Sequence, residues 1–270
     1  MGMNMIVYQI VNEFKRLDEV VAITLAGSCA SGRKDIYSDI DIDIIINKDI
    51  PVEKREIIAK KFSDIIEINN NFWGSSDEFV LRNSSIQVDI AYFEFNWLKD
   101  QLSNIVDNYN ASLGYTTCFW HNVINSVIVY DKINSFKELQ EKYKIEYPIE
   151  LKKNIINKNY PILKNKFSAY YNQICKAINR KDLVNINNRV SAFLDSYFDI
   201  IFAINEIPHP GEKRLLNITK NICNKLPKEF VENIEILIES VGKCDSTILE
   251  NIDNMIKELD IVLKNEKLIS

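Results

Sequence analysis

The residues that could carry chemistry are concentrated in one stretch near the N-terminus. Gly27 and Ser28 follow a short β-branched run, and Asp39, Asp41 and Asp43 come soon afterwards in an Asp-Ile-Asp-Ile-Asp-Ile alternation. Successive side chains of a strand point to opposite faces, so the alternation predicts carboxylates on one face and isoleucines on the other. Like charges about 7 Å apart along one strand repel each other unless a cation lies between them.

A divalent metal ion would relieve this repulsion. Mg²⁺ prefers hard oxygen ligands, usually one or two carboxylates completed by substrate phosphates and water. A glycine permits a tight turn and a close backbone approach, so Gly27 and Ser28 could present backbone amides to phosphate oxygens. Asp89 lies in a second alternating stretch, Ile86 to Ala91, and strand pairing would bring this third carboxylate near. The sequence therefore predicts a site for magnesium and a phosphorylated ligand.

The elements that must position these residues change in type along the chain. The first half mixes helical spacing with alternating and β-branched runs, which predicts helices and strands together. From about Pro148 the pattern is uniformly helical, and the longest helix is expected to begin after Asp182, a suitable N-cap, and to end at Ile207. The expected strands are 20–26, 39–46, 78–82 and 85–93, and the expected helices are 5–17, 57–66, 95–109, 183–207, 212–224, 228–241 and 246–264.

This pattern predicts an α+β protein of two domains. A small mixed-sheet catalytic domain is expected over residues 1–147, and an all-helical bundle that binds substrate over residues 148–270. An apolar content of 46% is ample for a core of this size.

Composition excludes several classes of protein. A net charge of −5 disfavours nucleic acid as the main partner, because binding a long polyanion requires a basic stripe. The five cysteines are widely spaced and include no C-x-x-C pair, which indicates neither a disulfide framework nor a zinc site. No signal peptide and no long apolar span is evident. We therefore expect a cytoplasmic protein that is not bound to a membrane.

The whole pattern resembles the DNA polymerase β-like nucleotidyltransferase superfamily. Its signature is a Gly-Ser or Gly-Gly turn, then an Asp-x-Asp or Asp-x-Glu strand, then a third acidic residue on a later strand. The resemblance covers roughly the first 95 residues. The order of a small catalytic domain and a helical domain, with the run Tyr37-Ser38-Asp39-Ile40-Asp41, looks like the antibiotic-modifying branch, the aminoglycoside and lincosamide nucleotidyltransferases.

The resemblance implies a role for each matching residue. Asp39 and Asp41 would ligate magnesium, and Asp89 would act on the acceptor hydroxyl as a metal ligand or general base. The turn would bind the β- and γ-phosphates through Gly27 and Ser28.

Two interpretations remain open for each of the other charged residues. Asp43 departs from the family pattern, and it either supports the metal ligands from behind or is a solvated strand-end charge. Arg33 and Lys34 could steer the triphosphate, although a charged pair in a loop is usually solvated. The same choice, between a functional residue and an ordinary helix-surface or loop charge, is left open for Asp195, Asp199, Lys213 and Arg214.

The predicted activity is magnesium-dependent nucleotidyl transfer. A nucleoside monophosphate, AMP from ATP by expectation, would pass to a hydroxyl of a small molecule such as an antibiotic, with release of pyrophosphate. One alternative is a protein hydroxyl as acceptor, as in antitoxin-type relatives, and another is a catalytically silent nucleotide-binding module. The oligomeric state is left open, with a homodimer among the alternatives.

Overall fold

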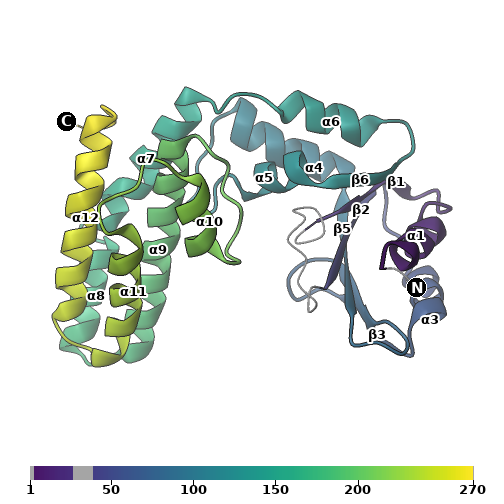
Figure 1. The fold of residues 1–270 in the computed structure, drawn as a ribbon, viewed down its shortest axis with the longest axis horizontal. Coiled ribbons are helices and arrows are strands. Elements are labelled where there is room, and N and C mark those ends of the chain that lie inside the picture. The colour runs from purple at the N-terminus through teal and green to yellow at the C-terminus, as the bar shows by residue number, and fades with distance from the viewer. Residues whose placement is uncertain (1–2, 27–38, 270) are drawn as a thin grey trace. The chain divides into compact units, whose positions relative to one another are not determined.

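The computed structural model describes residues 3–26 and 39–269 of the 270-residue chain (Figure 1). These residues fall into two compact units, Met1–Ser103 with Asn122–Ile145, and Asn104–His121 with Glu146–Ser270. The first unit contains a mixed β-sheet, and the second is built from helices. The predicted fold class, a mixed-sheet α+β domain followed by a helical bundle, is confirmed.

The sheet of the first unit has six strands in the order β3-β4-β5-β2-β1-β6. Its central pair, β2 and β5, is parallel, and the other neighbouring pairs are antiparallel. The strand bounds are β1 (Val20–Leu25), β2 (Ile40–Ile46), β3 (Ile65–Asn70), β4 (Ser76–Val80), β5 (Gln87–Glu94) and β6 (Val127–Asp131).

The alternation in β2 separates the two faces of the sheet as predicted. Ile40, Ile42 and Ile44 are buried in the core of the first unit, whereas Asp41 and Asp43 are half-buried. Helices α1 (Met3–Phe14) and α3 (Val52–Phe62) pack further apolar side chains into that core, together with residues of β1, β4 and β5. One face of β2 therefore anchors the strand, and the other carries its carboxylates.

The expected helix over residues 57–66 is wrong at its C-terminal end. Helix α3 ends at Phe62, and Ser63 is already extended. The Ser63 hydroxyl donates to the Val80 carbonyl at 2.6 Å and accepts from the Ile65 amide at 2.9 Å. Ile65 and Ile66 then pair with β4 as the first residues of β3. Isoleucines at helical spacing fit both structures, and pairing with β4 decided between them.

The next helices contain two points where the chain passes between the two units, because residues 104–107 and 118–121 belong to the second unit. Helix α4 (Phe95–Leu102) packs on β5 and continues into a π-helical turn, Ser103–Asp107, close to the expected end of that helix at residue 109. Helices α5 (Cys118–Asn125) and α6 (Ser135–Tyr143) follow, and α6 packs on β1 and β6. Strand β6 and helices α5 and α6 were not predicted from the sequence.

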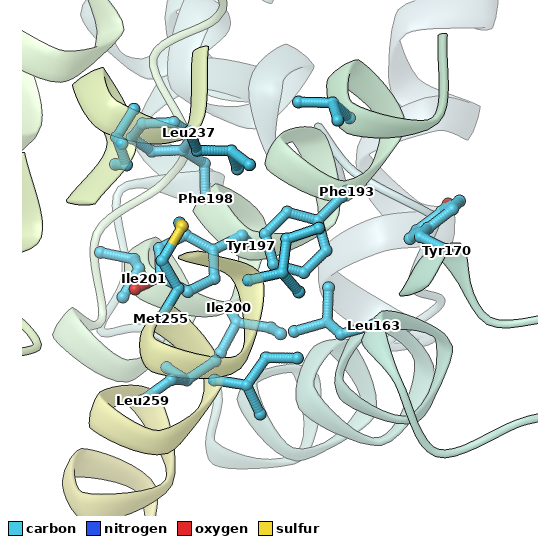
Figure 2. Packing of buried hydrophobic residues seen from close by; sticks show 14 of the residues in the cluster. Leu163, Tyr170, Phe193, Tyr197, Phe198, Ile200, Ile201, Leu237, Met255 and Leu259 are labelled. Carbon is cyan, nitrogen blue, oxygen red and sulfur yellow. The ribbon is translucent and has the colours of Figure 1, made fainter. Parts of the chain in front are cut away.

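The second unit is a bundle around a long central helix. Helix α9 (Leu183–Asn205) packs against α7 (Ile149–Leu163) and α8 (Tyr170–Asn179), and its N-cap is Asp182 as predicted, whose side chain accepts from the Asn185 amide at 3.1 Å. Figure 2 shows the core of this bundle, including Tyr197 and Met255. The remaining helices are α10 (Leu215–Ile222), α11 (Phe230–Ser240), a short 3-10 turn (Val241–Lys243) and α12 (Thr247–Asn265). Within the described residues, no helix is both long enough and apolar enough to span a membrane.

The segment 104–121 joins the helical unit through buried polar contacts. The Gly114 amide donates to the Asn159 side chain at 3.0 Å, and the Thr116 amide and hydroxyl donate to the Asp199 carboxylate at 3.1 and 2.6 Å. Asp199 is only 1% exposed, and burial raises its pKa to about 7. Its carboxylate is therefore part of the interior of this unit.

Candidate active site

The carboxylates of Asp41 and Asp89 are brought together by the parallel pairing of β2 with β5. Asp41 and Asp89 are direct register partners, and both side chains are half-buried on the face opposite the isoleucine core. Neighbouring strands lie about 4.8 Å apart, so the two carboxylates stand side by side. Strands distant in sequence thus place two like charges at one point of the sheet.

Asp39 and Asp43 flank this pair along the chain. Asp39 directly precedes β2 and is exposed. Asp43 is half-buried and pairs with Thr24 of β1. Burial, and next the negative charge of Asp41, raise the pKa of Asp43 to about 7. The negative charge of Asp41 therefore accounts for part of this shift, after burial.

Two further carboxylates lie across the sheet beyond Asp89. Glu78 of β4 is the register partner of Asp89, and Glu67 of β3 is the register partner of Glu78. Burial, then the charges of Asp89 and Glu67, raise the pKa of Glu78. Four carboxylates from four neighbouring strands thus follow one line across the sheet. We call them the acidic row: Asp41, Asp89, Glu78 and Glu67.

Two amide side chains hold part of this row. Gln87 donates from Nε2 to Asp89 Oδ1 at 2.8 Å and to Glu78 Oε2 at 3.2 Å. Asn70 donates from Nδ2 to Glu78 Oε1 at 3.1 Å. Each Glu78 oxygen therefore accepts a hydrogen bond, and one amide group bridges Glu78 and Asp89.

The chemistry of this donor set fits magnesium. Among the described residues, no three His, Cys, Asp or Glu side chains are grouped so as to hold a metal ion by themselves. Magnesium rarely needs such a cage, because it is usually bound by one or two carboxylates together with phosphate oxygens and water. Asp41 and Asp89, with Asp39 beside them, can supply the carboxylate share of such a site.

Four of the predicted binding residues, Gly27, Ser28, Arg33 and Lys34, lie outside the described residues. Of the residues left open in the helical unit, Lys213 and Arg214 are exposed ahead of α10. Asp195 is half-buried on α9 and accepts the Tyr115 hydroxyl at 2.9 Å. Asp199 is not a surface charge of α9, because its carboxylate is buried.

Gln87 and Glu78 were not predicted from the sequence as neighbours of the site. Both lie in or beside predicted strands, and Gln87 shares a face with Asp89 by the period of two. That alternation was sufficient to place Gln87 near Asp89. The order of strands in the sheet, which brings Glu78 there, has no signal in the sequence.

A comparison with protein-family models assigns the domain. Residues 7–108 match the model described as "Nucleotidyltransferase domain". This range contains β2, β5 and the carboxylates of the acidic row. The chain thus carries a nucleotidyltransferase domain, and the predicted enzyme class and the resemblance to nucleotidyltransferases are confirmed.

Several solved structures are similar to this chain at low identity. A nucleotidyltransferase-like protein from Exiguobacterium sibiricum is 12% identical, with 99% of this chain and 76% of that chain covered and a TM-score of 0.47. The spectinomycin adenyltransferase of Enterococcus faecialis, solved with ATP and spectinomycin, is 13% identical, with 94% and 99% covered and a TM-score of 0.30. A STING-associated c-di-GMP synthase from Capnocytophaga granulosa is 14% identical, with 98% and 80% covered and a TM-score of 0.30. No curated protein matches this chain.

Proposed function

We propose that this protein is a magnesium-dependent nucleotidyltransferase that transfers AMP from ATP to a hydroxyl of a small molecule and releases pyrophosphate. The observation that carries the proposal is the register pairing of Asp41 with Asp89 on one polar face of the nucleotidyltransferase domain. The carboxylates of Asp39 and Asp41 would hold magnesium, and Asp89 would be a further ligand or the general base. When bound, magnesium neutralises charge on the triphosphate and on the leaving pyrophosphate.

In the proposed reaction the acceptor oxygen forms a bond to the α-phosphorus as the bond from that phosphorus to pyrophosphate breaks. Asp89 would take the hydroxyl proton, which would leave an AMP ester, pyrophosphate and a protonated carboxyl group. Gly27 and Ser28 would bind the β- and γ-phosphates, with Arg33 and Lys34 nearby in sequence to steer the triphosphate.

We assign the nucleotide to the catalytic domain, residues 1–147, and acceptor recognition to the helical domain, residues 148–270. Small-molecule acceptors differ widely in shape, and a helical unit separate from the sheet can vary without disturbing the carboxylates. An antibiotic is one such acceptor, and the cytoplasm supplies ATP and magnesium.

The test is a pyrophosphate-release assay of the purified protein with ATP, GTP, CTP or UTP and a panel of hydroxyl-bearing antibiotics. Acceptor-dependent pyrophosphate release that needs magnesium and is lost in Asp41→Asn supports the proposal. Label transferred from α-labelled ATP to proteins of a cell lysate, with no small-molecule product, would replace it by the protein-modifying alternative. Nucleotide binding without transfer to either kind of acceptor would favour the silent module.

A further inference from the structure

The side chain of Gln87 lies between two carboxylates of neighbouring strands. Its Nε2 group donates to Asp89 Oδ1 on its own strand at 2.8 Å and to Glu78 Oε2 on β4 at 3.2 Å. Ionised carboxylates only accept hydrogen bonds, so the amide must turn its NH₂ group toward both of them. Its two hydrogens then serve one carboxylate each.

We propose that Gln87 and Glu78 form a positioning pair that fixes the orientation of the Asp89 carboxylate toward the metal–nucleotide complex. This inference rests on the proposed function, since it assigns Asp89 to that complex. Gln87 and Glu78 are positioning residues, because they act through Asp89.

The need for such a pair follows from the register of the sheet. Asp89 has Asp41 as its partner on one side and Glu78 on the other. Without a donor between them, Glu78 and Asp89 would repel and their side chains would rotate apart. The Gln87 amide replaces this repulsion by two charge-assisted hydrogen bonds, which are stronger and more directional than neutral ones.

The Glu78 side chain is itself held by a second hydrogen bond, so its carboxylate has a fixed position relative to the Gln87 amide. Its other oxygen, Oε1, accepts from the Asn70 side chain at 3.1 Å. The order of contacts is therefore Asn70 on β3, Glu78 on β4, then Gln87 and Asp89 on β5. Side chains that orient a metal ligand in this way typically change metal affinity or activity 10- to 100-fold when they are lost.

The experiment measures Mn²⁺ binding in the presence of ATP by electron paramagnetic resonance, because Mn²⁺ replaces magnesium in such sites and needs no acceptor. The variant Gln87→Leu keeps the size of the side chain and removes both donors. We expect its Mn²⁺ dissociation constant to rise about 10-fold. Gln9→Leu is the matched control, because it makes the same substitution at an exposed position of α1, outside the row of carboxylates, and its binding should be unchanged.

A charge-preserving exchange separates positioning from net charge. Gln87→Glu alone places a third carboxylate beside Asp89 and Glu78 and should weaken Mn²⁺ binding. Adding Glu78→Gln restores the wild-type charge and returns one amide to the cluster, so the double variant should bind Mn²⁺ more tightly than Gln87→Glu. Equal losses in Gln87→Leu and Gln9→Leu would overturn the inference, as would a double variant no tighter than the Gln87→Glu single variant.

The same titrations separate failure of the inference from failure of the proposed function. If wild-type protein with ATP binds no Mn²⁺, or binds it as well as Asp41→Asn does, the proposed metal site is wrong and the inference falls with it. If Asp41→Asn loses binding while Gln87→Leu matches wild type, only the positioning role is refuted.

Discussion

Neither Asp41 nor Asp89 is an unusual carboxylate by itself. The pairing of β2 with β5 places the two side by side. Their pairing concentrates negative charge on one face of the sheet. On the same strand, burial and then the charge of Asp41 raise the pKa of Asp43. Proteins tolerate unfavourable charge of this kind at sites that act on substrates. Substitution of one of these carboxylates should therefore affect activity and stability in opposite directions.

Asp41→Asn should abolish nucleotidyl transfer and leave the fold intact. An amide keeps the shape of the side chain but is a poor ligand for magnesium, whereas loss of one negative charge relieves repulsion from Asp43 and Asp89. The metal-free variant should be as stable as wild type or more stable by up to about 1 kcal/mol. Pyrophosphate release and urea unfolding measure the two effects.

Asp43→Asn is the comparison, and it should retain more activity than Asp41→Asn because Asp43 lies farther along β2 from Asp89. Equal damage by both substitutions would mean that the metal-binding pair was chosen wrongly. Near-wild-type activity in Asp41→Asn would remove Asp41 from the site.

Among the elements, β2 was predictable and β3 was not. The alternation of β2 reports its two environments directly, because every second residue is an isoleucine in the core. Strand β3 begins with isoleucines that also fit the preceding helix, and its start depends on contacts of Ser63 with a strand 17 residues later in the chain. Pairing between distant segments decides such cases, and a single sequence does not record it.

Ser63→Ala should destabilise the first unit by about 1–3 kcal/mol, because Ser63 is only 1% exposed and its hydroxyl bonds both the Val80 carbonyl and the Ile65 amide. Ser84→Ala is a matched control: the Ser84 hydroxyl also accepts from the amide two residues on, that of Ile86 at 2.8 Å, but in an exposed turn. Its cost should stay within about 0.5 kcal/mol. Similar unfolding free energies for the two variants would contradict the role given to Ser63.

In the helical unit, the segment 104–121 depends on one glycine. Gly114 has φ +76°, and a Cβ placed there would lie 2.8 Å from Cβ of Asp195 on α9. Gly114→Ala therefore combines backbone strain with a steric clash and should cost about 2 kcal/mol or more.

Gly211→Ala isolates the backbone contribution. Gly211 has φ +96°, and nothing lies within 4 Å of a Cβ added there. Its cost should therefore be lower than that of Gly114→Ala, by an amount that measures the clash. If urea unfolding gives equal losses for the two variants, Gly114 is not a close-packing position.

For the molecule as a whole, two buried groups in the helical unit oppose each other as the pH changes. Burial raises the pKa of Asp199 to about 7, so the folded state holds a proton that the unfolded state releases near pH 4. Burial, and next the charge of His121, lower the pKa of His209 to about 4, so the unfolded state binds a proton below pH 6.5 that the folded state refuses.

The two groups have opposite signs in the linkage relation. The contribution of Asp199 to stability is complete below about pH 4 and is lost as the pH rises to about 7, whereas that of His209 is complete above about pH 6.5 and is lost as the pH falls to about 4. Each slope reaches at most about 1.4 kcal/mol per pH unit. In the wild-type protein the two slopes should largely cancel in this range.

Removing one group at a time should expose the other. In Asp199→Asn the free energy of unfolding should rise between pH 4 and 6.5, and in His209→Asn it should fall between pH 4 and 7. The measurement is urea unfolding followed by fluorescence of the buried Trp120, which belongs to the helical unit, with Trp73 and Trp97 of the other unit changed to phenylalanine.

The same measurements can contradict the expected cancellation between Asp199 and His209. Both variants are compared with the wild type at each pH, so that groups elsewhere in the chain subtract out. Wild-type stability relative to Asp199→Asn must decrease as the pH rises, and relative to His209→Asn it must increase. Curves parallel to the wild type in both variants would mean that neither group changes its pKa on folding, and the polar interior of the helical unit would then be held by hydrogen bonds alone.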